Sequence, residues 1–411
     1  MHPSDPGLLK RRGPYSVLVL DPWSRSSLAA CRALGRREAF KVGVAGSGTH
    51  GMAAGPAAIS RYASWYDRLP DHNGPADEFA SAMERLIAKR GYDVVISTTD
   101  STLARLATVS LSVPTFPNVG RAFSVLADKA GLADLCATVG VPYPRTFSPR
   151  TDDEVRTAVD ELGPPVVVKS SRSAEAGSLA VSGASGARVC HDRDEAVSAV
   201  RLLTAAGLRP IVQSRVRSAD KLNAVVIRNN GAGEYRYAHR VLRETPISGG
   251  IGVALQTISA EAGPGAEAAD ILERVCDAAG YTGLAQAEFY RSADDGRLYI
   301  LDVNPRLWGS TWFAEKLGQR VVERGVRFAL DLPPLAARPY RLGRRFHTPI
   351  GELRWLREQD GKRGALVELA RTTRPWDVFE FVDLRDPVPL AFYVMLALRP
   401  QMRRSGPGDG L

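Results

Sequence analysis

The sequence predicts a mixed α/β protein in which a parallel β-sheet near the N-terminus is followed by a larger domain of α+β type. Short apolar runs alternate with helical patterns over roughly the first hundred residues, which is typical of a parallel sheet. Further along the chain, several strand patterns end in a β-hairpin. The chain has 411 residues, of which 44% are hydrophobic and 24% charged, as expected for a globular protein of two to three domains.

The N-terminal domain is expected to span residues 15–120, after a disordered start at residues 1–14. Three apolar runs indicate its buried strands: Tyr15 to Leu20, Lys41 to Ala45 and Asp93 to Ser97. Helical patterns between them run from Ser26 to Leu34 and from Asp77 to Lys89. Ligands bind at the carboxyl ends of parallel strands, so Asp21, Ser47 and Thr98 to Asp100 are expected at a ligand-facing edge. The same short polar residues are common helix caps, and capping is the safer interpretation.

A second domain is expected over residues 121–330, with residues 143–215 as a subdomain. A helical pattern from Phe123 to Val139 opens the domain and contains Asp128 and Lys129. The elements of the subdomain follow in order: a helix from Asp152 to Leu162, a strand from Pro165 to Lys169, a loop of small residues from Ser170 to Gly186, a strand from Ala187 to Cys190, a helix from Asp194 to Thr204 and a strand from Ile211 to Val216.

Lys169 ends its strand directly before the loop of small residues. Such a loop can fold over phosphates and offer backbone N–H donors, while the lysine supplies a point charge. Many strands end in lysine, so this feature alone is a weak signal of phosphate binding.

A β-hairpin is the most informative stretch of the chain. It is preceded by strands from Leu222 to Arg228 and Tyr235 to Leu242, a glycine-rich segment from Ser248 to Gly252 and a helix from Ala266 to Ala279. The hairpin itself consists of strands from Leu284 to Tyr290 and Leu298 to Val303, joined by the turn from Ser292 to Gly296.

The hairpin carries a candidate cation site. Side chains alternate between the faces of a strand, so Asp302 and Asn304 share one face. If the register brings Glu288 across from either residue, two carboxylates and an amide oxygen converge, which suits magnesium bridging phosphate oxygens. Arg306 follows, and its planar guanidinium could hold a carboxylate or a phosphate. A surface hairpin with a solvated end is the alternative interpretation.

The last part of the chain, residues 331–411, is expected to be a connector and a small C-terminal extension. Before it, Gly309 to Leu330 forms a helical pattern that Gly318 interrupts. Helical patterns within the extension run from Gly351 to Glu358 and from Gly364 to Thr372. The most apolar stretch, Pro387 to Leu398, is too short to span a bilayer, so a buried helix is favoured over contact with a membrane surface.

Charge and cysteine usage exclude several classes of protein. The formal net charge is +9, but no basic run is interleaved with aromatic residues, so an anionic substrate or nucleotide explains the charge and no nucleic-acid partner is expected. The four cysteines lie far apart without a CxxC pair, which argues against a zinc site or a disulfide framework. The N-terminus lacks the pattern of a signal peptide. We therefore expect a cytoplasmic protein without a transmembrane segment.

The order of these motifs resembles the ATP-grasp superfamily. The pattern consists of Asp-Lys in a helix before GVPYP, then PVVVK with a loop of small residues, then IVQSRV, then a carboxylate strand and the D-x-N-P-R sequence that ends at Arg306. The likeness covers roughly Phe123 to Leu330 and is closest to ATP-dependent carboxylate-amine ligases, including the ATP-grasp domains of carbamoyl-phosphate synthetase and biotin carboxylase. It implies an ATP-grasp fold with residues 143–215 as a lid, preceded by a Rossmann-like pre-ATP-grasp domain.

The resemblance implies six contacts to ATP: Lys129, Lys169, Gln213, Ser214, Val216 and Asp220. Both lysines would contact phosphates, and Lys169 would also act in catalysis. The segment at the end of the IVQSRV strand would be the adenine hinge, with the carbonyl of Ser214 and the amide of Val216 reading the base. Asp220 would hold the ribose hydroxyls.

The resemblance also implies the metal and substrate contacts. Glu288, Asp302 and Asn304 would bind one or two magnesium ions, for which manganese can substitute. Arg306 would be catalytic, meeting the acyl phosphate rather than a protein carboxylate. Substrate contacts would come from His239, Arg240 and Ser248 to Gly250.

Two features depart from the family pattern. The loop after Lys169 has only Gly177 in its first half, where relatives often have several glycines, so its closure over ATP is expected to differ. The second metal carboxylate is Asp302 rather than the commoner glutamate, which keeps the charge but shortens the side chain by one methylene.

The activity implied by the resemblance is ATP-dependent ligation of a small-molecule carboxylate to an amine. The carboxylate attacks the γ-phosphate of ATP, and the amine then displaces phosphate from the acyl phosphate, so no protein nucleophile is needed. A phosphotransferase that stops after phosphoryl transfer and a non-catalytic nucleotide-binding module are the alternatives. The oligomeric state stays open, although a homodimer through the first domain is common among such enzymes.

Overall fold

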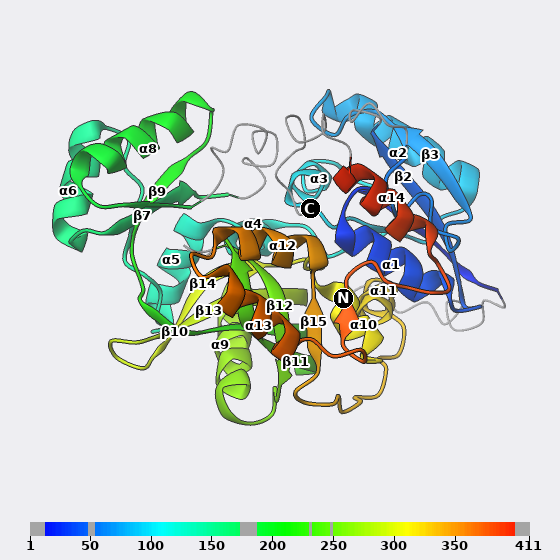
Figure 1. The fold of residues 1–411 in the computed structure, drawn as a ribbon. Coiled ribbons are helices and arrows are strands. Elements are labelled where there is room, and N and C mark those ends of the chain that lie inside the picture. Colours follow the sequence, from blue (N-terminus) through cyan, green and yellow to red (C-terminus); the bar gives the residue numbers. More distant parts are fainter. Residues whose placement is uncertain (1–12, 48–53, 173–186, 230–231, 247–249, 399–411) are drawn as a thin grey trace.

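The computed structural model describes residues 13–47, 54–172, 187–229, 232–246 and 250–398. Within these ranges the strands form sheets of five, four and seven strands. In Figure 1 the five-stranded sheet lies at the right in blue, the four-stranded sheet at the upper left in green, and the seven-stranded sheet between and below them. Most of the expected disordered start at residues 1–14, and most of the loop from Ser170 to Gly186, lies outside the described residues.

The five-stranded sheet is parallel throughout and has the strand order β3-β2-β1-β4-β5. Its strands are β1 (Tyr15–Val19), β2 (Phe40–Ser47), β3 (Trp65–Leu69), β4 (Val94–Ile96) and β5 (Thr115–Phe116). The helices α1 (Arg25–Gly35), α2 (Ala76–Arg90) and α3 (Asp100–Leu106) connect them. β1 and β4 are almost entirely buried apolar runs, as strands covered on both faces must be. The predicted parallel α/β domain is therefore confirmed, with β3, β5 and α3 as additional elements.

The helix expected from Phe123 to Val139 is instead two helices. They are α4 (Arg121–Leu126) and α5 (Lys129–Thr138). Asp128 lies between them and caps α5, because its Oδ1 accepts a backbone N–H from the first turn. Lys129 is thus the first residue of α5, and its backbone N–H donates to the carbonyl of Ser171. The prediction of one continuous helix is wrong because the aspartate side chain competes with the backbone for amide hydrogens.

The four-stranded sheet is antiparallel and has the order β6-β9-β7-β8. Its strands are β6 (Thr146–Phe147), β7 (Val166–Ser170), β8 (Arg188–Cys190) and β9 (Pro210–Ser214), and the helices α6 (Asp152–Leu162) and α8 (Arg193–Ala205) pack on it. The amphipathic helices turn side chains such as Val155 and Leu203 toward the buried face of β7. This part of the chain has a hydrophobic core of its own.

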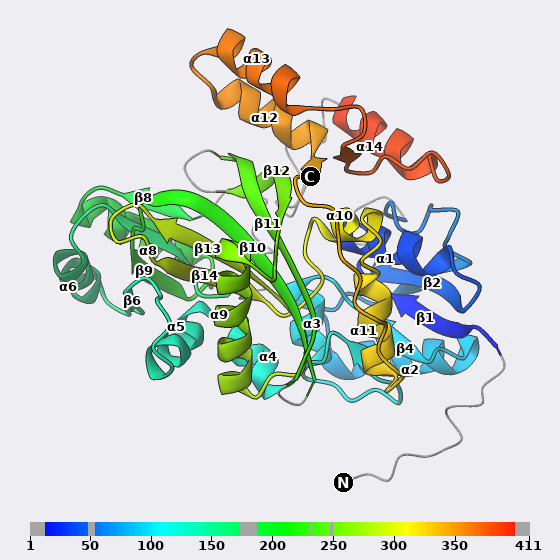
Figure 2. The same cartoon turned by 90° about the horizontal axis from the view of Figure 1, so that it is seen from below.

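The seven-stranded sheet has the order β14-β13-β10-β11-β12-β15-β16. Its strands are β10 (Ser218–Asn229), β11 (Ala232–Thr245), β12 (Ile251–Ile258), β13 (Gly283–Ser292), β14 (Leu298–Asn304), β15 (Arg345–His347) and β16 (Val378–Phe379). Figure 2 shows α9 (Gly263–Ala279) against this sheet, where its apolar face joins the core. β12 is not among the predicted strands, because the glycines before it weaken the strand pattern.

Gly318 interrupts the helical pattern of residues 309–330, as predicted. Its φ is +77°, and the helices α10 (Thr311–Lys316) and α11 (Val321–Ala329) lie on either side of it. A positive φ is strained for other residues, so a glycine suits this break between two helices.

The C-terminal segment is joined to both domains. Besides β15 and β16 it contains α12 (Pro349–Glu358), α13 (Lys362–Thr372) and α14 (Val388–Leu398). Arg32 of α1 is 1% exposed and donates from Nε to Asp386 Oδ2 at 2.8 Å. Asp386 also accepts from Ser60 Oγ at 2.7 Å. The segment expected as an appended extension therefore completes one edge of the large sheet and forms a buried ion pair with the N-terminal domain.

Helix α14 and the four cysteines both contribute to the buried part of the protein. α14 buries Tyr393 and Leu396 while Val394 and Met395 stay exposed, so it is buried on one side only. In the part of the chain that the structure describes, no helix combines the length and hydropathy needed to cross a bilayer. All four cysteines are buried and unpaired, as expected.

Candidate active site

The register of the hairpin places the predicted metal ligands side by side. Glu288 of β13 lies opposite Asp302 of β14, and Gln286 lies opposite Asn304. Directly opposed residues of an antiparallel pair point to the same face. The convergence expected from the sequence is thus present, and metal binding by these residues stays a prediction.

Two lysines lie next to the carboxylates. Lys129 Nζ is 3.3 Å from Asp302 Oδ1, and Lys221 Nζ is 3.6 Å from Glu288 Oε2. Burial would lower the pKa of Lys221, but nearby negative groups, Glu288 foremost, outweigh burial and raise that pKa. Lys221 is not among the predicted site residues, because a single lysine in a strand pattern is indistinguishable from a solvated one.

A chain of amides fixes the orientation of Asn304. Its Nδ2 donates to Gln286 Oε1 at 2.9 Å, and Gln286 Nε2 donates to Asn223 Oδ1 at 2.6 Å. These bonds use the amide nitrogen of Asn304 and leave its oxygen to act as an acceptor. The side chains of Glu288 and Asp302 are 36% and 22% exposed, so a cation can reach them.

The donor set fits magnesium. Two carboxylates and one amide oxygen are the hard oxygen ligands that this ion prefers, with water or phosphate oxygens completing its shell. Within the described ranges, no group of three or more His, Cys, Asp or Glu side chains could hold a metal. The candidate site therefore depends on the pair of carboxylates and on oxygens that a nucleotide would bring.

Lys169 of β7 belongs to the same cluster of charges. Its pKa is lowered to about 8, first because the side chain is buried and then because the charge of Lys129 is near, while Asp302 and Glu288 act in the opposite direction. An added anion would stabilise the charged form of such a lysine. The two lysines predicted to bind phosphate thus meet at the predicted metal ligands.

A cavity of about 730 Å³ opens beside the hairpin, between the five-stranded and seven-stranded sheets. Asp302 and Arg306 line it from the large sheet. Asp21, Ser47 and Thr98 to Asp100 line it from the N-terminal domain, so these residues do meet at one edge of the sheet. That a ligand binds at this edge stays a prediction. The volume suits a small organic molecule.

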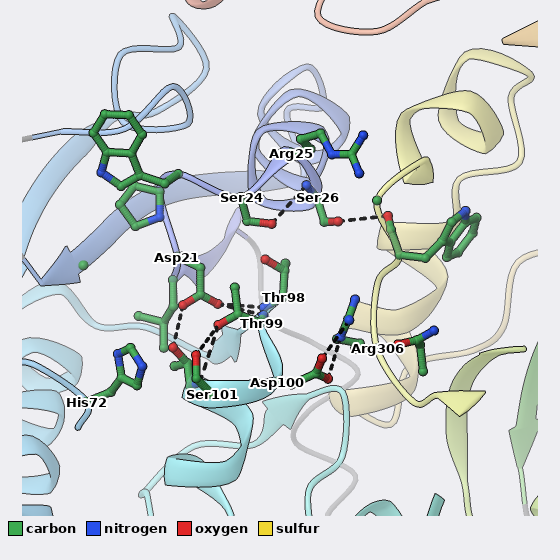
Figure 3. Close-up of a pocket in the computed structure, with 18 of the residues that line it drawn as sticks. Asp21, Ser24, Arg25, Ser26, His72, Thr98, Thr99, Asp100, Ser101 and Arg306 are labelled. Carbon is green, nitrogen blue, oxygen red and sulfur yellow. Dashed lines mark hydrogen bonds and ion pairs between the residues drawn. The ribbon is translucent and has the colours of Figure 1, made fainter. Parts of the chain in front are cut away.

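Asp21 organises the N-terminal wall of the cavity (Figure 3). Its carboxylate accepts hydrogen bonds from Ser97 Oγ at 2.8 Å, from the backbone N–H groups of Thr98 and Thr99 at 2.8 and 3.2 Å, and from Thr102 Oγ1 at 2.6 Å. Thr99 also caps α3. The capping interpretation therefore holds for Thr99, and ligand binding by this loop stays a prediction.

Arg306 forms a bidentate ion pair with Asp100 (Figure 3). Nε donates to Oδ1 at 2.7 Å, and Nη2 donates to Oδ2 at 2.8 Å. Burial would raise the pKa of Asp100, but Arg306 outweighs burial and holds that pKa below its usual value. The expectation that Arg306 does not pair with a protein carboxylate is contradicted, because the fold brings together two residues that are 206 positions apart.

The family model of the ATP-grasp domain matches residues 134–341, just over half of the 411-residue chain. The chain belongs to the ATP-grasp family. This membership confirms the family and the fold class predicted from the order of the motifs. No curated protein sequence matches the chain.

Solved structures share the ATP-grasp architecture over most of the chain. N5-carboxyaminoimidazole synthetase from Staphylococcus aureus complexed with ADP matches with a TM-score of 0.64 and 13% identity, covering 82% of each chain. Biotin carboxylase from Campylobacter jejuni matches with a TM-score of 0.60 and 14% identity over 80% of this chain and 74% of that one. L-amino acid ligase from Bacillus licheniformis matches with a TM-score of 0.59 and 14% identity over 79% and 76%. At these identities the likeness establishes the fold.

The predicted adenine hinge of the ATP-grasp domain joins its two sheets. Gln213 and Ser214 end β9, and Val216 lies in the link to β10. Gln213 is buried and donates from Nε2 to Thr146 Oγ1 at 2.8 Å, and the backbone N–H of Ser214 donates to the carbonyl of Arg145. Asp220 lies 2.9 Å from Arg240 Nη2, so its predicted ribose contact would have to share this ion pair. The nucleotide roles of these residues stay predictions.

The residues expected to contact substrate lie in different surroundings, and only some of them line the cavity. His239 lines the cavity, is 2% exposed, and has no hydrogen-bond partner for Nδ1 within the described part of the chain. Burial lowers the pKa of His239 to about 3, so the ring is neutral at pH 7. Arg240 instead pairs with Asp220. Ser248 and Gly249 lie outside the described residues.

Proposed function

We propose that this protein is an ATP-dependent carboxylate-amine ligase, which forms an amide or peptide bond through an acyl phosphate and releases ADP and phosphate. One observation carries the proposal: Lys129, Lys169, Glu288 and Asp302 form one cluster of charges that adjoins a cavity of about 730 Å³. The cluster suits the phosphates of ATP, and the cavity has room for the molecules to be joined.

The lysines and the hairpin would bind the nucleotide. Lys129 and Lys169 would lie along the phosphates, where each offsets negative charge. Glu288, Asp302 and Asn304 would hold magnesium, which when bound stabilises the charge that gathers on the transferring phosphoryl group. The family match, and a structural relative complexed with ADP, support the use of ATP and magnesium.

The cavity would bring the carboxylate and the amine to the transferred phosphate. A carboxylate is a poor acylating agent, so it first attacks the γ-phosphate and becomes an acyl phosphate. Arg306, held by Asp100 at the cavity wall, would stabilise the negative charge of that intermediate. The amine nitrogen then forms the C–N bond, phosphate leaves with the C–O bonding electrons, and the proton of the amine passes to solvent or phosphate. The small-molecule partners are one carboxylate and one amine, while a homodimer and a cytoplasmic location stay predictions.

The experiment is a product analysis by mass spectrometry. The protein is incubated with ATP, magnesium and a mixture of carboxylates and amines, beginning with amino acids, and we expect ADP, phosphate and an amide. Release of AMP and pyrophosphate would contradict the mechanism. A stable phosphorylated product formed without any amine would indicate a phosphotransferase. Thermal stabilisation by ATP with no turnover in any mixture would indicate a binding module.

A further inference from the structure

The cavity contains two arginines, and each is paired with a carboxylate. Arg306 is paired with Asp100. Arg25, the first residue of α1, donates from Nη1 to Glu380 Oε1 at 2.8 Å. The side chain of Arg25 is 13% exposed and that of Glu380 is 4% exposed, so solvent and salt screen this pair only weakly. Glu380 therefore cancels most of the positive charge that Arg25 would present to the cavity.

The fold positions Arg25 against the loop that follows Arg306. Gly309 leaves room for the guanidinium, because a Cβ at that position would lie 2.5 Å from Arg25 Nη2. Ser26 donates from Oγ to the carbonyl of Trp308 at 2.9 Å, and its backbone N–H donates to Ser24 Oγ at 3.2 Å (Figure 3). The hydroxyl of Ser26 thus ties the first turn of α1 to the loop that follows Arg306.

Apart from the imidazoles of His72, whose Nδ1 lies 3.6 Å from Asp71 Oδ1, and His239, which is neutral at pH 7, the other titratable side chains of the described cavity wall are carboxylates. The acidic residues that line the cavity are Asp21, Asp71, Asp100, Glu288 and Asp302. The described wall contains no lysine. The internal segments outside the described residues also contain no lysine or arginine in their sequences: 48–53, 173–186, 230–231 and 247–249. Even if Glu288 and Asp302 are set aside as candidate metal ligands, three carboxylates remain beside two arginines that are already paired.

This balance of charge disfavours a phosphorylated substrate. A phosphomonoester carries about −1.5 to −2 charges at pH 7. Arg306 is assigned to the acyl phosphate by the proposed function. Away from Arg306, the phosphate of such a substrate would face Asp21, Asp71 and an arginine, Arg25, that Glu380 already neutralises. Placing like charges side by side is costly in a binding site. A neutral or protonated amine meets no such cost.

Neutral polar groups supply the rest of the polar wall. They include the hydroxyls of Ser24, Ser47, Thr99, Ser101 and Ser310 and the amide of Asn73. Hydroxyl and amide groups on a ligand can exchange hydrogen bonds with such a wall without bringing charge.

We propose that the cavity binds a polar amine that carries hydroxyl or amide groups and no phosphate, and that Glu380 enforces this choice by cancelling the charge of Arg25. The proposal rests on the proposed function, because it names the class of amine that the ligase joins to the carboxylate. Amino acids and amino sugars belong to this class, and amino-group-bearing phosphate esters do not.

The test uses matched pairs of amines that differ only in a phosphate. The pairs are serine and phosphoserine, ethanolamine and phosphoethanolamine, and glucosamine and glucosamine 6-phosphate, each offered with ATP, magnesium and the same carboxylates. Amide products are measured by mass spectrometry. In any pair that reacts, we expect the unphosphorylated member to react at least roughly tenfold faster. Equal rates, or a preference for the phosphorylated member, would overturn the proposal while leaving the ligase function in place.

The variant Glu380→Gln keeps a hydrogen-bond acceptor beside Arg25 but removes the negative charge. We expect it to reduce the preference for the unphosphorylated member by roughly tenfold, because Arg25 then presents its charge to the cavity. Glu368→Gln is the matched control: Glu368 is a half-exposed carboxylate that pairs with Arg243 and does not line the cavity. An unchanged preference in Glu380→Gln would remove Glu380 from the proposal. If Glu380→Gln does not fold, the double variant Arg25→Met with Glu380→Gln removes both charges and should keep the wild-type preference; loss of that preference would also count against the proposal.

If no pair yields an amide although ATP binds, and the wider product analysis also finds none, the ligase proposal fails and the cavity is judged by binding alone. Equilibrium dialysis of the same pairs against the protein with magnesium and ADP should then retain the unphosphorylated members selectively. Equal retention within the pairs, preferential retention of the phosphorylated members, or no retention of any unphosphorylated amine would overturn the inference about the cavity.

Discussion

The two walls of the cavity are built from different chemistry. The wall from the large sheet presents the ionised groups Glu288, Asp302 and Arg306, and each lies within ion-pair distance of an opposite charge. The wall from the N-terminal domain presents many hydroxyl and amide groups beside four ionised side chains, Asp21, Arg25, Asp71 and Asp100. Asp21 is occupied by four hydrogen-bond donors, and Arg25 and Asp100 are held in ion pairs.

Because their chemistry differs, we expect the two walls to have different roles, one in the chemical step and one in substrate recognition. Charge that develops during phosphoryl transfer is stabilised by ionised groups held in position, and these lie on the hairpin side. Recognition of a substrate by neutral hydrogen bonds changes its affinity more than the rate of the chemical step. We therefore expect substitutions on the hairpin wall to lower kcat and substitutions on the N-terminal wall to raise KM.

The largest effect is expected from the hairpin carboxylates. Glu288→Gln or Asp302→Asn should lower kcat by about 10³-fold or more, because a bound metal ion contributes several kcal/mol to the transition state. The measurement is ADP release with the substrates found by product analysis, and circular dichroism checks that each variant is folded. Asp295→Asn, in the turn of the same hairpin, is the control and should keep full activity. Full activity in either carboxylate variant would remove the metal assignment.

Arg306 should give the next largest effect. Arg306→Lys keeps a charge but loses the bidentate bond to Asp100, so the charge is no longer held in place. We expect kcat to fall by about 10²-fold, with the KM for ATP changed by less than about threefold. Arg291→Lys, near the hairpin turn, is a control for the substitution itself, since Arg291 pairs with Glu267 outside the cavity. A change in the KM for ATP alone would place Arg306 in nucleotide binding instead.

The lowered pKa of Lys169 predicts a smaller, pH-dependent effect. With a pKa of about 8, Lys169 is mostly charged at pH 7 and mostly neutral at pH 9. ATP should favour the charged form, so its affinity should fall about tenfold between these pH values. Titrations with EDTA present keep metal ions out of the measurement. Lys169→Arg stays charged throughout and should show a flatter profile; an equally steep profile in that variant would assign the pH dependence to another group.

The same two walls differ in how far the sequence could predict them. The hairpin was predictable because alternation places Asp302 and Asn304 on one face and a short turn limits the register to a few choices. Both the alternation and the turn length can be read from residues that are close together in the sequence. The order of the lysines before it completed the ATP-grasp pattern, which the family match confirms.

The pairing of Asp100 with Arg306 could not be predicted in this way. Each residue has a local interpretation, as a helix-starting aspartate and as an anion-binding arginine, and only the packing of two domains joins them. The role of the C-terminal segment in the cavity was hidden for the same reason, because Glu380 reaches Arg25 across 355 positions. Ion pairs between residues that are far apart in the sequence produce no periodic pattern from which they could be predicted.

Hydrogen bonding by the side chain of Asp128 explains why the helix predicted from Phe123 to Val139 is two helices. The pattern from Phe123 to Val139 favours a single helix, yet α4 ends at Leu126 and Asp128 caps α5. This break places Lys129 at the start of α5, from which its side chain reaches Asp302. The Asp-Lys pair within this helical pattern therefore indicates a helix cap, while phosphate binding by Lys129 stays a prediction.

The smallest effect is expected on the N-terminal wall. Ser101 lines the cavity, and its Oγ lies 3.5 Å from Thr99 Oγ1, so its removal costs the protein little internally. Ser101→Ala should raise the KM for the acceptor amine by roughly two- to tenfold, the worth of one neutral hydrogen bond, and leave kcat unchanged. Ser112→Ala, whose hydroxyl bonds to Glu84 away from the cavity, is the matched control. If kcat falls and KM does not change, the neutral wall takes part in the chemical step. The assignment of chemistry to the hairpin wall and of substrate recognition to the N-terminal wall would then be wrong, even if the hairpin residues have the roles proposed for them.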